Sequence, residues 1–204
     1  DYTVQDNRVK KLYELGKQLN WNAETDVDWT PEFKEITDEE FDFENNQWSE
    51  HPVYKTWDTE KRKEFIKDLN AWSISQFLHG EQGALLVASQ LASCAPTFNA
   101  KLYAASQTFD EARHVEAFNK YLQTRIKRTW PIGRALKGLL DKILTDERWD
   151  LKFIGMQIVI EGLALAAFQA SREASSDPVY KEFVGYIIRD EARHVTFGVN
   201  YLEE

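Results

Sequence analysis

The sequence predicts an all-α fold, a four-helix bundle preceded by an N-terminal arm, in a single domain of residues 1–204. Apolar residues recur at helical spacing in several long stretches, whereas sustained alternation and hairpin turn dipeptides are absent. The hexapeptide DEARHV occurs twice, at residues 110–115 and 190–195. A lone glutamate stands 30 positions before the glutamate of each copy, so the repeated unit is a pair of helices.

Residues 1–58 form the predicted arm. Apolar residues at helical spacing over 4–19 are typical of an amphipathic helix. Residues 21–57 are acidic and rich in tryptophan, with two prolines, which indicates loops and short helices wrapped around a larger body. We interpret the tryptophans as packing residues, in preference to a ligand-binding surface. They are Trp21, Trp29, Trp48 and Trp57.

Residues 59–204 form the predicted core. Thr59 can cap a long helix that runs to about residue 95, because Pro96 cannot continue it. A second helix spans about 97–128, and a short connecting helix spans about 131–145.

A third helix is expected over about residues 150–175. Its centre is apolar nearly all round, which predicts a helix buried on all sides. The fourth helix begins with Asp177 as its N-cap and Pro178 in its first turn, and it runs to the end of the chain.

The two lone glutamates predict the site. Glu161 lies within the most apolar helix, where an isolated carboxylate would be strongly penalised or would take up a proton. A metal ion compensates such charge when other ligands converge on it. Each hexapeptide supplies a glutamate and a histidine three residues apart, hence on one helix face. The predicted ligands are Glu81, Glu111, His114, Glu161, Glu191 and His194.

Four carboxylates and two imidazoles suit two divalent ions, provided that some carboxylates bridge. Oxygen-rich sites of this kind favour iron or manganese over zinc. The remaining polar residues of the hexapeptides are expected to support the ligands. The aspartates could accept the free ring N–H of the histidines, and the arginines could neutralise the aspartates. These residues are Asp110, Arg113, Asp190 and Arg193.

A buried ion-pair core is the competing interpretation. One Glu-x-x-His pair is a weak signal on its own. Two identical copies, each with an apolar-flanked glutamate at the same offset, favour the dinuclear site.

These ligands resemble the set of the ferritin-like di-iron carboxylate superfamily over residues 59–204, and the doubled hexapeptide is similar to that of bacterial monooxygenase hydroxylases. The resemblance implies a ribonucleotide-reductase-like fold and a pair of iron ions that activates dioxygen. Manganese in place of iron at one or both positions is an alternative. It also implies that Glu111 and Glu191 bridge the metals, while Glu81 and Glu161 are more terminal.

Three departures separate the chain from particular relatives. Phe118 stands where ribonucleotide reductase small subunits carry a radical tyrosine. Ile187 stands where p-aminobenzoate N-oxygenases carry an extra histidine ligand. Leu165 replaces the threonine of methane and toluene monooxygenase hydroxylases.

The predicted activity is that of a non-haem di-iron oxygenase or oxidase, an oxidoreductase acting on a small, mainly apolar organic molecule. Residues one turn from the ligands are expected to line its pocket, although the same residues could simply form the bundle core. They are Phe77, Leu85, Val115, Phe118, Gln157, Leu165, Phe168, Ile187 and Val195. Iron handling (ferroxidase activity, storage or peroxide scavenging) and a radical or metal subunit of a larger complex are the alternatives.

The remaining expectations concern partners. Without a flavin, nicotinamide or iron–sulfur motif, electrons must come from an external reductase or ferredoxin. A net charge of −9 argues against nucleic acid. No secretory signal and no uncharged stretch of 18 apolar residues is visible, so we expect no membrane span and a cytoplasmic location. A homodimer is an open alternative to a monomer.

Overall fold

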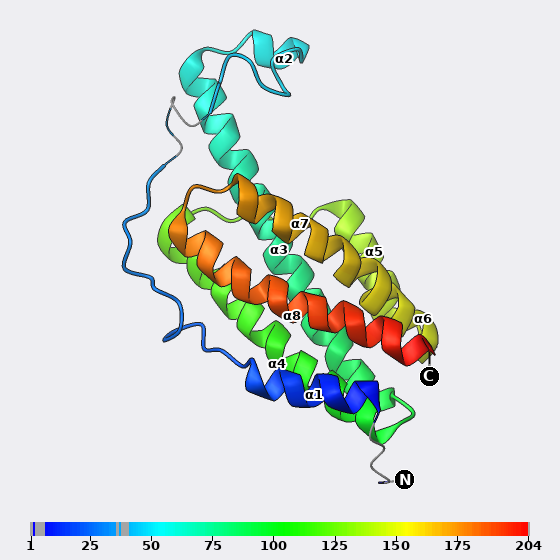
Figure 1. The fold of residues 1–204 in the computed structure, drawn as a ribbon. Coiled ribbons are helices and arrows are strands. Elements are labelled where there is room, and N and C mark those ends of the chain that lie inside the picture. The colour runs from blue at the N-terminus through cyan, green and yellow to red at the C-terminus, as the bar shows by residue number, and fades with distance from the viewer. Residues whose placement is uncertain (1, 3–6, 36, 38–40, 204) are drawn as a thin grey trace.

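The computed structural model describes residues 2, 7–35, 37 and 41–203, and within them every regular element is helical. The predicted all-α fold is confirmed. Figure 1 shows the bundle as long helices lying side by side. Its helices are α3 (Thr59–Cys94), α4 (Phe98–Tyr121), α7 (Glu161–Ala174) and α8 (Pro178–Glu203).

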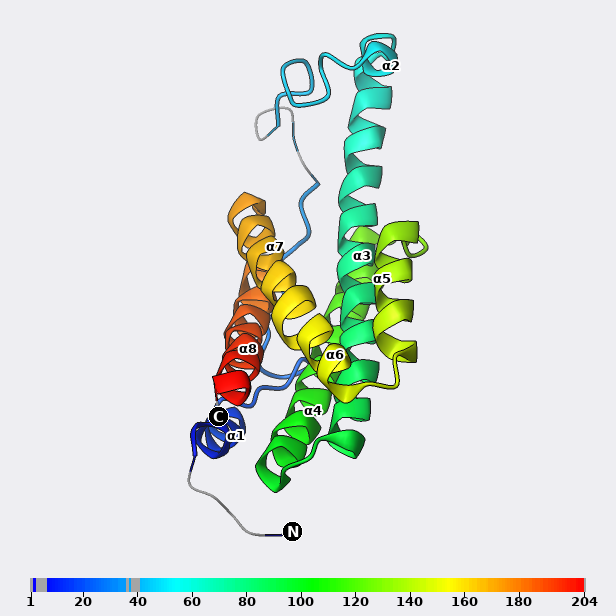
Figure 2. The same cartoon turned by 90° about the vertical axis from the view of Figure 1, so that its right-hand side faces the viewer.

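The N-cap of helix α3 is Asp58, one residue before Thr59, which the sequence predicted. The Asp58 carboxylate, not the Thr59 hydroxyl, caps it by accepting a hydrogen bond from the Lys61 amide at 2.8 Å. Asp58 suits the N-cap position because the positive end of the helix dipole also favours its negative charge. The N-terminal part of α3 extends beyond the other helices and carries the short α2 (Pro52–Lys55) at its end (Figure 2).

Helix α4 is capped by Thr97, whose hydroxyl accepts a hydrogen bond from the Ala100 amide. It continues into a π-helical turn, η1 (Leu122–Ile126), which is capped by Lys127 in the left-handed conformation at φ 55°. Helix α5 (Arg134–Thr145) is the predicted connecting helix and packs against α3.

The third predicted helix is continuous but not uniform. It comprises α6 (Trp149–Phe153), the π-helical η2 (Ile154–Ile160) and α7. The prediction that it is buried on all sides is wrong, because Leu163 is 63% exposed and Val159 is 42% exposed. Only one side packs into the bundle, and Glu161 lies on that side. By length and apolar composition alone, 149–174 could also cross a membrane.

Asp177 caps α8 as predicted, accepting a hydrogen bond from the Val179 amide at 3.0 Å. Its other carboxylate oxygen accepts a hydrogen bond from the Tyr121 hydroxyl at 2.9 Å, which ties the start of α8 to the end of α4.

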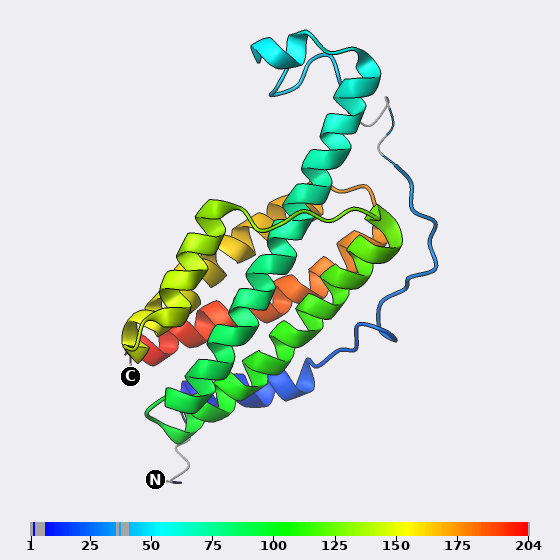
Figure 3. The same cartoon turned by 180° about the vertical axis from the view of Figure 1, so that it is seen from behind.

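The arm contributes α1 (Arg8–Gln18), which packs against α4 and α8. The predicted helix over 4–19 is therefore shorter, and its residues 4–6 lie outside the described part of the chain. After α1 the arm runs irregularly along the outside of the bundle (Figure 3).

Two apolar clusters fill the bundle. One contains Phe118, Phe168 and Ile187, and the other contains Tyr103, Met156 and Phe197. Along each bundle helix, the predicted ligands fall between residues of one cluster and residues of the other. The polar site is therefore a layer enclosed by apolar packing at both ends.

Candidate metal centre

The structure brings all six predicted ligand side chains together inside the bundle. Each of the four helices supplies a glutamate, and α4 and α8 add a histidine one turn later. All six residues are at most 3% exposed. Their donor atoms form two groups that could each hold a metal ion. One group is Glu81, Glu111, His114 and Glu191, and the other is Glu111, Glu161, Glu191 and His194.

Both histidines turn Nδ1 toward the carboxylates. His114 Nδ1 lies 2.8 Å from a Glu81 oxygen and 3.1 Å from a Glu191 oxygen. His194 Nδ1 lies 3.2 Å from a Glu111 oxygen and 3.7 Å from a Glu161 oxygen. Donor atoms spaced by about 3 Å suit metal–ligand bonds of about 2.1 Å.

Several of these buried atoms lack hydrogen bonds. Among the described residues, no hydrogen-bond partner exists for Glu111 Oε2, for either carboxylate oxygen of Glu191, or for His194 Nδ1, although histidine and carboxylate atoms lie near one another as ion pairs. Unsatisfied buried polar atoms are costly, so their concentration at one point calls for a further group. Carboxylate and imidazole donors fit a pair of divalent ions such as iron or manganese.

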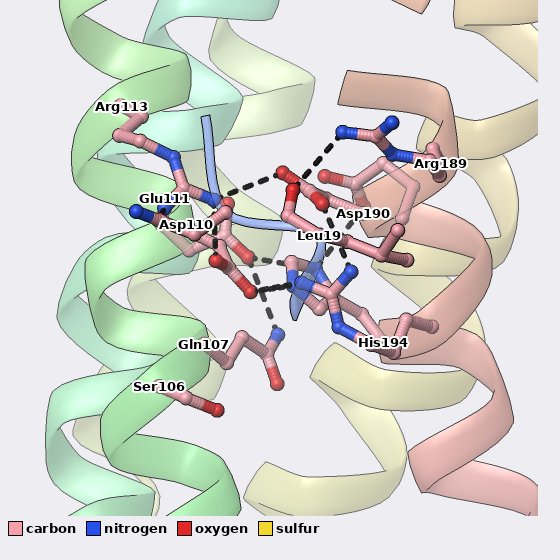
Figure 4. A network of polar contacts seen from close by, with 12 residues as sticks. Leu19, Ser106, Gln107, Asp110, Glu111, Arg113, Arg189, Asp190 and His194 are labelled. Atoms are coloured by element: carbon pink, nitrogen blue, oxygen red, sulfur yellow. Dashed lines mark hydrogen bonds and ion pairs between the residues drawn. The ribbon is translucent and has the colours of Figure 1, made fainter. Parts of the chain in front are cut away.

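The two hexapeptides exchange their aspartates. His114 Nε2 lies 3.3 Å from Asp190. His194 Nε2 lies 3.1 Å from Asp110, and Figure 4 shows these two residues. Each histidine is thus supported by the aspartate of the other copy. An N–H donated from Nε2 to the aspartate leaves the Nδ1 lone pair free for a metal.

The arginines link the same two aspartates. Arg113 Nη2 donates to Asp110 at 2.6 Å and to Asp190 at 3.1 Å. Arg193 donates to Asp190 at 2.9 Å and to Asp110 at 2.5 Å. The predicted pairing of arginine with aspartate is confirmed, but each arginine spans both aspartates. Such sharing neutralises the buried charges and holds α4 against α8.

Electrostatics keep the aspartates ionised. Burial alone would raise the pKa of Asp110, but the hydrogen bond from His194 and the positive charges of His194 and Arg193 lower it. Burial is likewise outweighed at Asp190, where His114, Arg193 and the Trp21 N–H hold the pKa far below its ordinary value.

The glutamates divide into two kinds when no metal is bound. Burial, and then the charge of Glu191, raise the pKa of Glu81 and of Glu161. Burial opposes ionisation of Glu111 and Glu191 as well, but contacts with the histidines help to lower both pKa values. The two ionised glutamates are the two that belong to both donor groups.

The arm closes one side of the site, which the sequence analysis missed. Trp21 Nε1 donates to Asp190 at 2.7 Å, and the indole stacks against the His114 ring at a centroid distance of 6.3 Å. The Leu19 carbonyl accepts a hydrogen bond from Arg189 at 3.0 Å (Figure 4). Interpreting Trp21 as a packing residue was therefore incomplete, since only the tertiary fold places it beside the hexapeptides.

Gln107 is a second residue that the sequence analysis missed. Its Nε2 donates to Glu161 at 2.7 Å and to Glu111 at 3.2 Å. It lies one turn before Glu111, a position from which a polar side chain could have been noticed. Figure 4 shows its amide directed at the carboxylates.

The nine predicted pocket residues do not share one environment. Phe118, Phe168 and Ile187 are packed in the first apolar cluster, with Phe77 against it. Gln157 is buried and donates a hydrogen bond to Gln107. The other four are only partly buried, namely Leu85, Val115, Leu165 and Val195.

A cavity of about 720 Å³ lies between α3, the start of α8 and the arm. Of the nine predicted pocket residues only Phe77 lines it. The Phe77 ring packs against Phe118 in a tilted arrangement and against Phe168 edge-on, at centroid distances of 5.8 and 4.9 Å. It lies one turn before Glu81, so this residue of the cavity wall is close in sequence to a candidate ligand.

No family model matches this chain, and no curated protein matches it significantly. Solved structures do match. A mutant R2-like ligand-binding oxidase with an anaerobically reconstituted Mn/Fe cofactor has a TM-score of 0.63 and 21% identity, over 95% of this chain and 73% of its own.

The R2-like ligand-binding oxidase of Sulfolobus acidocaldarius has a TM-score of 0.64 and 19% identity, over 96% of this chain and 72% of its own. The chain thus has the ferritin-like fold of R2-like ligand-binding oxidases, as the resemblance of its motifs predicted.

Proposed function

We propose that this chain is a dinuclear-metal oxidase or oxygenase that activates dioxygen and acts on a small, mainly apolar organic molecule. One observation carries the proposal. Two groups of buried donors lie side by side and share Glu111 and Glu191. Shared carboxylates are what two adjacent metal ions require, since six ligands suffice for two ions only when some of them bridge.

In this proposal Glu81 and His114 hold one metal, Glu161 and His194 hold the other, and Glu111 and Glu191 serve both. When bound, a pair of iron ions, or manganese with iron as in the matched oxidase structures, would supply electrons and open coordination positions for dioxygen.

The protein's own residues set the site's geometry. Asp110 and Asp190 fix the orientation of the histidines through Nε2. Phe118 and Phe168 are at most 1% exposed, so they exclude water from one end of the site.

The proposed substrate class is inferred from the cavity of about 720 Å³ that Phe77 lines. It is lined by aromatic side chains such as Phe33 and Trp48, together with polar groups. Phe77, which lines this cavity and lies one turn before Glu81, is the lining residue nearest in sequence to a candidate ligand. Electrons would come from an external reductase or ferredoxin, because the chain carries no motif for an organic redox cofactor.

Metal content tests the premise. Protein loaded anaerobically with ferrous iron should hold two irons per chain, measured by elemental analysis and Mössbauer spectroscopy. Glu161→Ala and Glu191→Ala should each lose iron, because each removes a donor that no neighbour can replace. Glu173→Ala is the matched control, since Glu173 is exposed on the same helix as Glu161. Two tightly bound irons in both site variants would refute the assignment.

Oxygen chemistry tests the activity. Ferrous protein should consume dioxygen in proportion to its iron, and an apolar substrate should accelerate the reaction and be oxidised, as mass spectrometry with ¹⁸O₂ would detect. Repeated catalytic oxidation of added ferrous iron, unaffected by any organic molecule, would instead indicate a ferroxidase.

A further inference from the structure

The internal repeat is symmetric in its ligands but not in the residues one turn away. Residues 80 positions apart occupy equivalent places in the two halves. Gln107 corresponds to Ile187, and Gln157 corresponds to Phe77. Two amide side chains, Gln107 and Gln157, therefore lie beside the half of the site that contains Glu161 and His194. The half that contains Glu81 and His114 has the apolar side chains of Phe77 and Ile187 in the equivalent places.

The Gln107 amide has a fixed direction. The lowered pKa of Glu111 keeps it ionised, and an ionised carboxylate only accepts hydrogen bonds, so the group facing Glu111 and Glu161 is the Gln107 NH₂. The Gln107 carbonyl oxygen then faces away from them and accepts a hydrogen bond from Gln157 Nε2 at 2.9 Å. The two amides thus form a chain of hydrogen bonds that ends on the carboxylates.

This chain leaves one acceptor free. Gln157 is 0% exposed. Its Oε1 nevertheless has no hydrogen-bond partner among the described residues. The hydroxyl of Tyr103, one turn before Gln107, is also buried without a partner there, and the residue equivalent to Tyr103 is Phe183. Two unpartnered polar groups on the same side of the site indicate a place for a small hydrogen-bonding ligand.

The backbone holds Gln157 in this position. Helix α8 approaches η2 so closely at Gly198 that a Cβ atom there would lie 2.8 Å from Gln157 Cβ. The residue equivalent to Gly198 in the other half is Phe118, which fills the corresponding space with a ring.

We propose that Gln107 and Gln157 are positioning residues that act mainly on the metal position held by Glu161 and His194, because Gln107 contacts Glu161 and the Glu111 oxygen that lies 3.2 Å from His194 Nδ1. Gln107 orients the two carboxylates, and Gln157 Oε1 accepts a hydrogen bond from a water or hydroxide ligand of that metal. The other position, beside Phe77 and Ile187, has no such acceptor from these equivalent residues. The inference rests on the proposed function, because it requires two bound metals.

Gln107→Met and Gln157→Met test the proposal, since methionine keeps the chain length and removes the amide. Ile187→Met is the matched control at the equivalent position. Each protein is titrated anaerobically with ⁵⁷Fe(II) and examined by Mössbauer spectroscopy, which reports the two irons as separate signals. In Gln107→Met we expect one iron to bind about 10- to 100-fold more weakly and its signal to shift more than that of the other iron.

Ile187→Met should leave both signals and both affinities within about twofold of wild type. Gln157→Met should weaken the same iron as Gln107→Met, by a smaller factor. The double variant should weaken this iron by less than the product of the two single effects, because the Gln107 carbonyl oxygen holds the Gln157 amide in place. Thermal unfolding of the metal-free variants shows whether they are folded.

Three results would overturn the proposal: wild-type affinities in Gln107→Met, equal weakening of both irons, or fully additive effects in the double variant. Failure of the wild-type protein to bind two irons would overturn the proposed function instead. The two failures are therefore distinguishable.

Discussion

At the scale of single residues, the aspartates of the hexapeptides explain how so much charge is tolerated inside the bundle. Asp190 accepts hydrogen bonds from Arg113, Arg193 and Trp21, with His114 Nε2 at 3.3 Å. A buried charge is stable only when it is paired and hydrogen-bonded on several sides.

Trp21→Phe isolates the contribution of the arm to this network. Phenylalanine preserves ring packing but removes the N–H donated to Asp190, so the free energy of unfolding should fall by about 1–3 kcal/mol. Trp29→Phe is the control, because Trp29 Nε1 donates to a neutral carbonyl, that of Ala23, and its loss should cost about 1 kcal/mol. Urea denaturation of the metal-free proteins measures the free energy of unfolding of both variants. An equal or smaller loss in Trp21→Phe would contradict the special role of the Asp190 bond.

The hexapeptides made the six candidate ligands predictable, because identical spacing on helices puts identical residues on equivalent faces. Their exchange of aspartates was not predictable, because it depends on how α4 and α8 approach each other. Gln107 and Trp21 were missed for the same reason. Neither belongs to a motif, and each acquires its contact only in the folded chain.

At the scale of helices, α8 and η2 approach each other closely at Gly198, and substitutions of glycine test how tightly they pack there. Gly198→Ala should destabilise the protein by about 1–3 kcal/mol, since the new methyl group would lie 2.8 Å from Gln157 Cβ and 3.1 Å from its backbone oxygen. Gly162→Ala, where nothing lies within 4 Å, should instead stabilise α7 by about 0.5–1 kcal/mol. Thermal and urea unfolding compare them, and similar values for the two variants would show that Gly198 is not tightly packed.

Helix boundaries were predictable where a cap or a proline marks them. Thr97, Asp177 and Pro96 each lie where the sequence placed them. The π-helical turns were not predictable, because their sequences have the apolar pattern of an ordinary helix. The exposed side of 149–174 was also missed, since periodicity cannot report which apolar faces lack a neighbour.

At the scale of the whole molecule, the site should make the stability of the metal-free protein depend on pH. Burial opposes the charge of His114 and His194, but their carboxylate neighbours raise both pKa values above the ordinary 6.5. The folded state therefore binds these protons more tightly than the unfolded state. This stabilisation is complete below pH 6.5 and is lost as the pH rises through the raised pKa values.

The raised pKa values of Glu81 and Glu161 act in the same direction. The melting temperature of metal-free protein should thus fall as the pH rises above 6.5 and through the raised pKa values. In the metal-loaded protein the fall should be much smaller, because bound metal replaces these protons. Calorimetry at several pH values, with and without iron, compares the two forms. Parallel pH profiles would argue against a metal site built from these residues.

The exchange of aspartates between the hexapeptides makes the two halves of the chain self-complementary. Asp110 supports His194, and Asp190 supports His114, so the contact between the halves repeats itself as an isologous dimer interface does. A single helix pair would leave its histidine without an aspartate, whereas two identical pairs would complete each other. A substitution of either hexapeptide aspartate therefore acts first on the histidine of the other half.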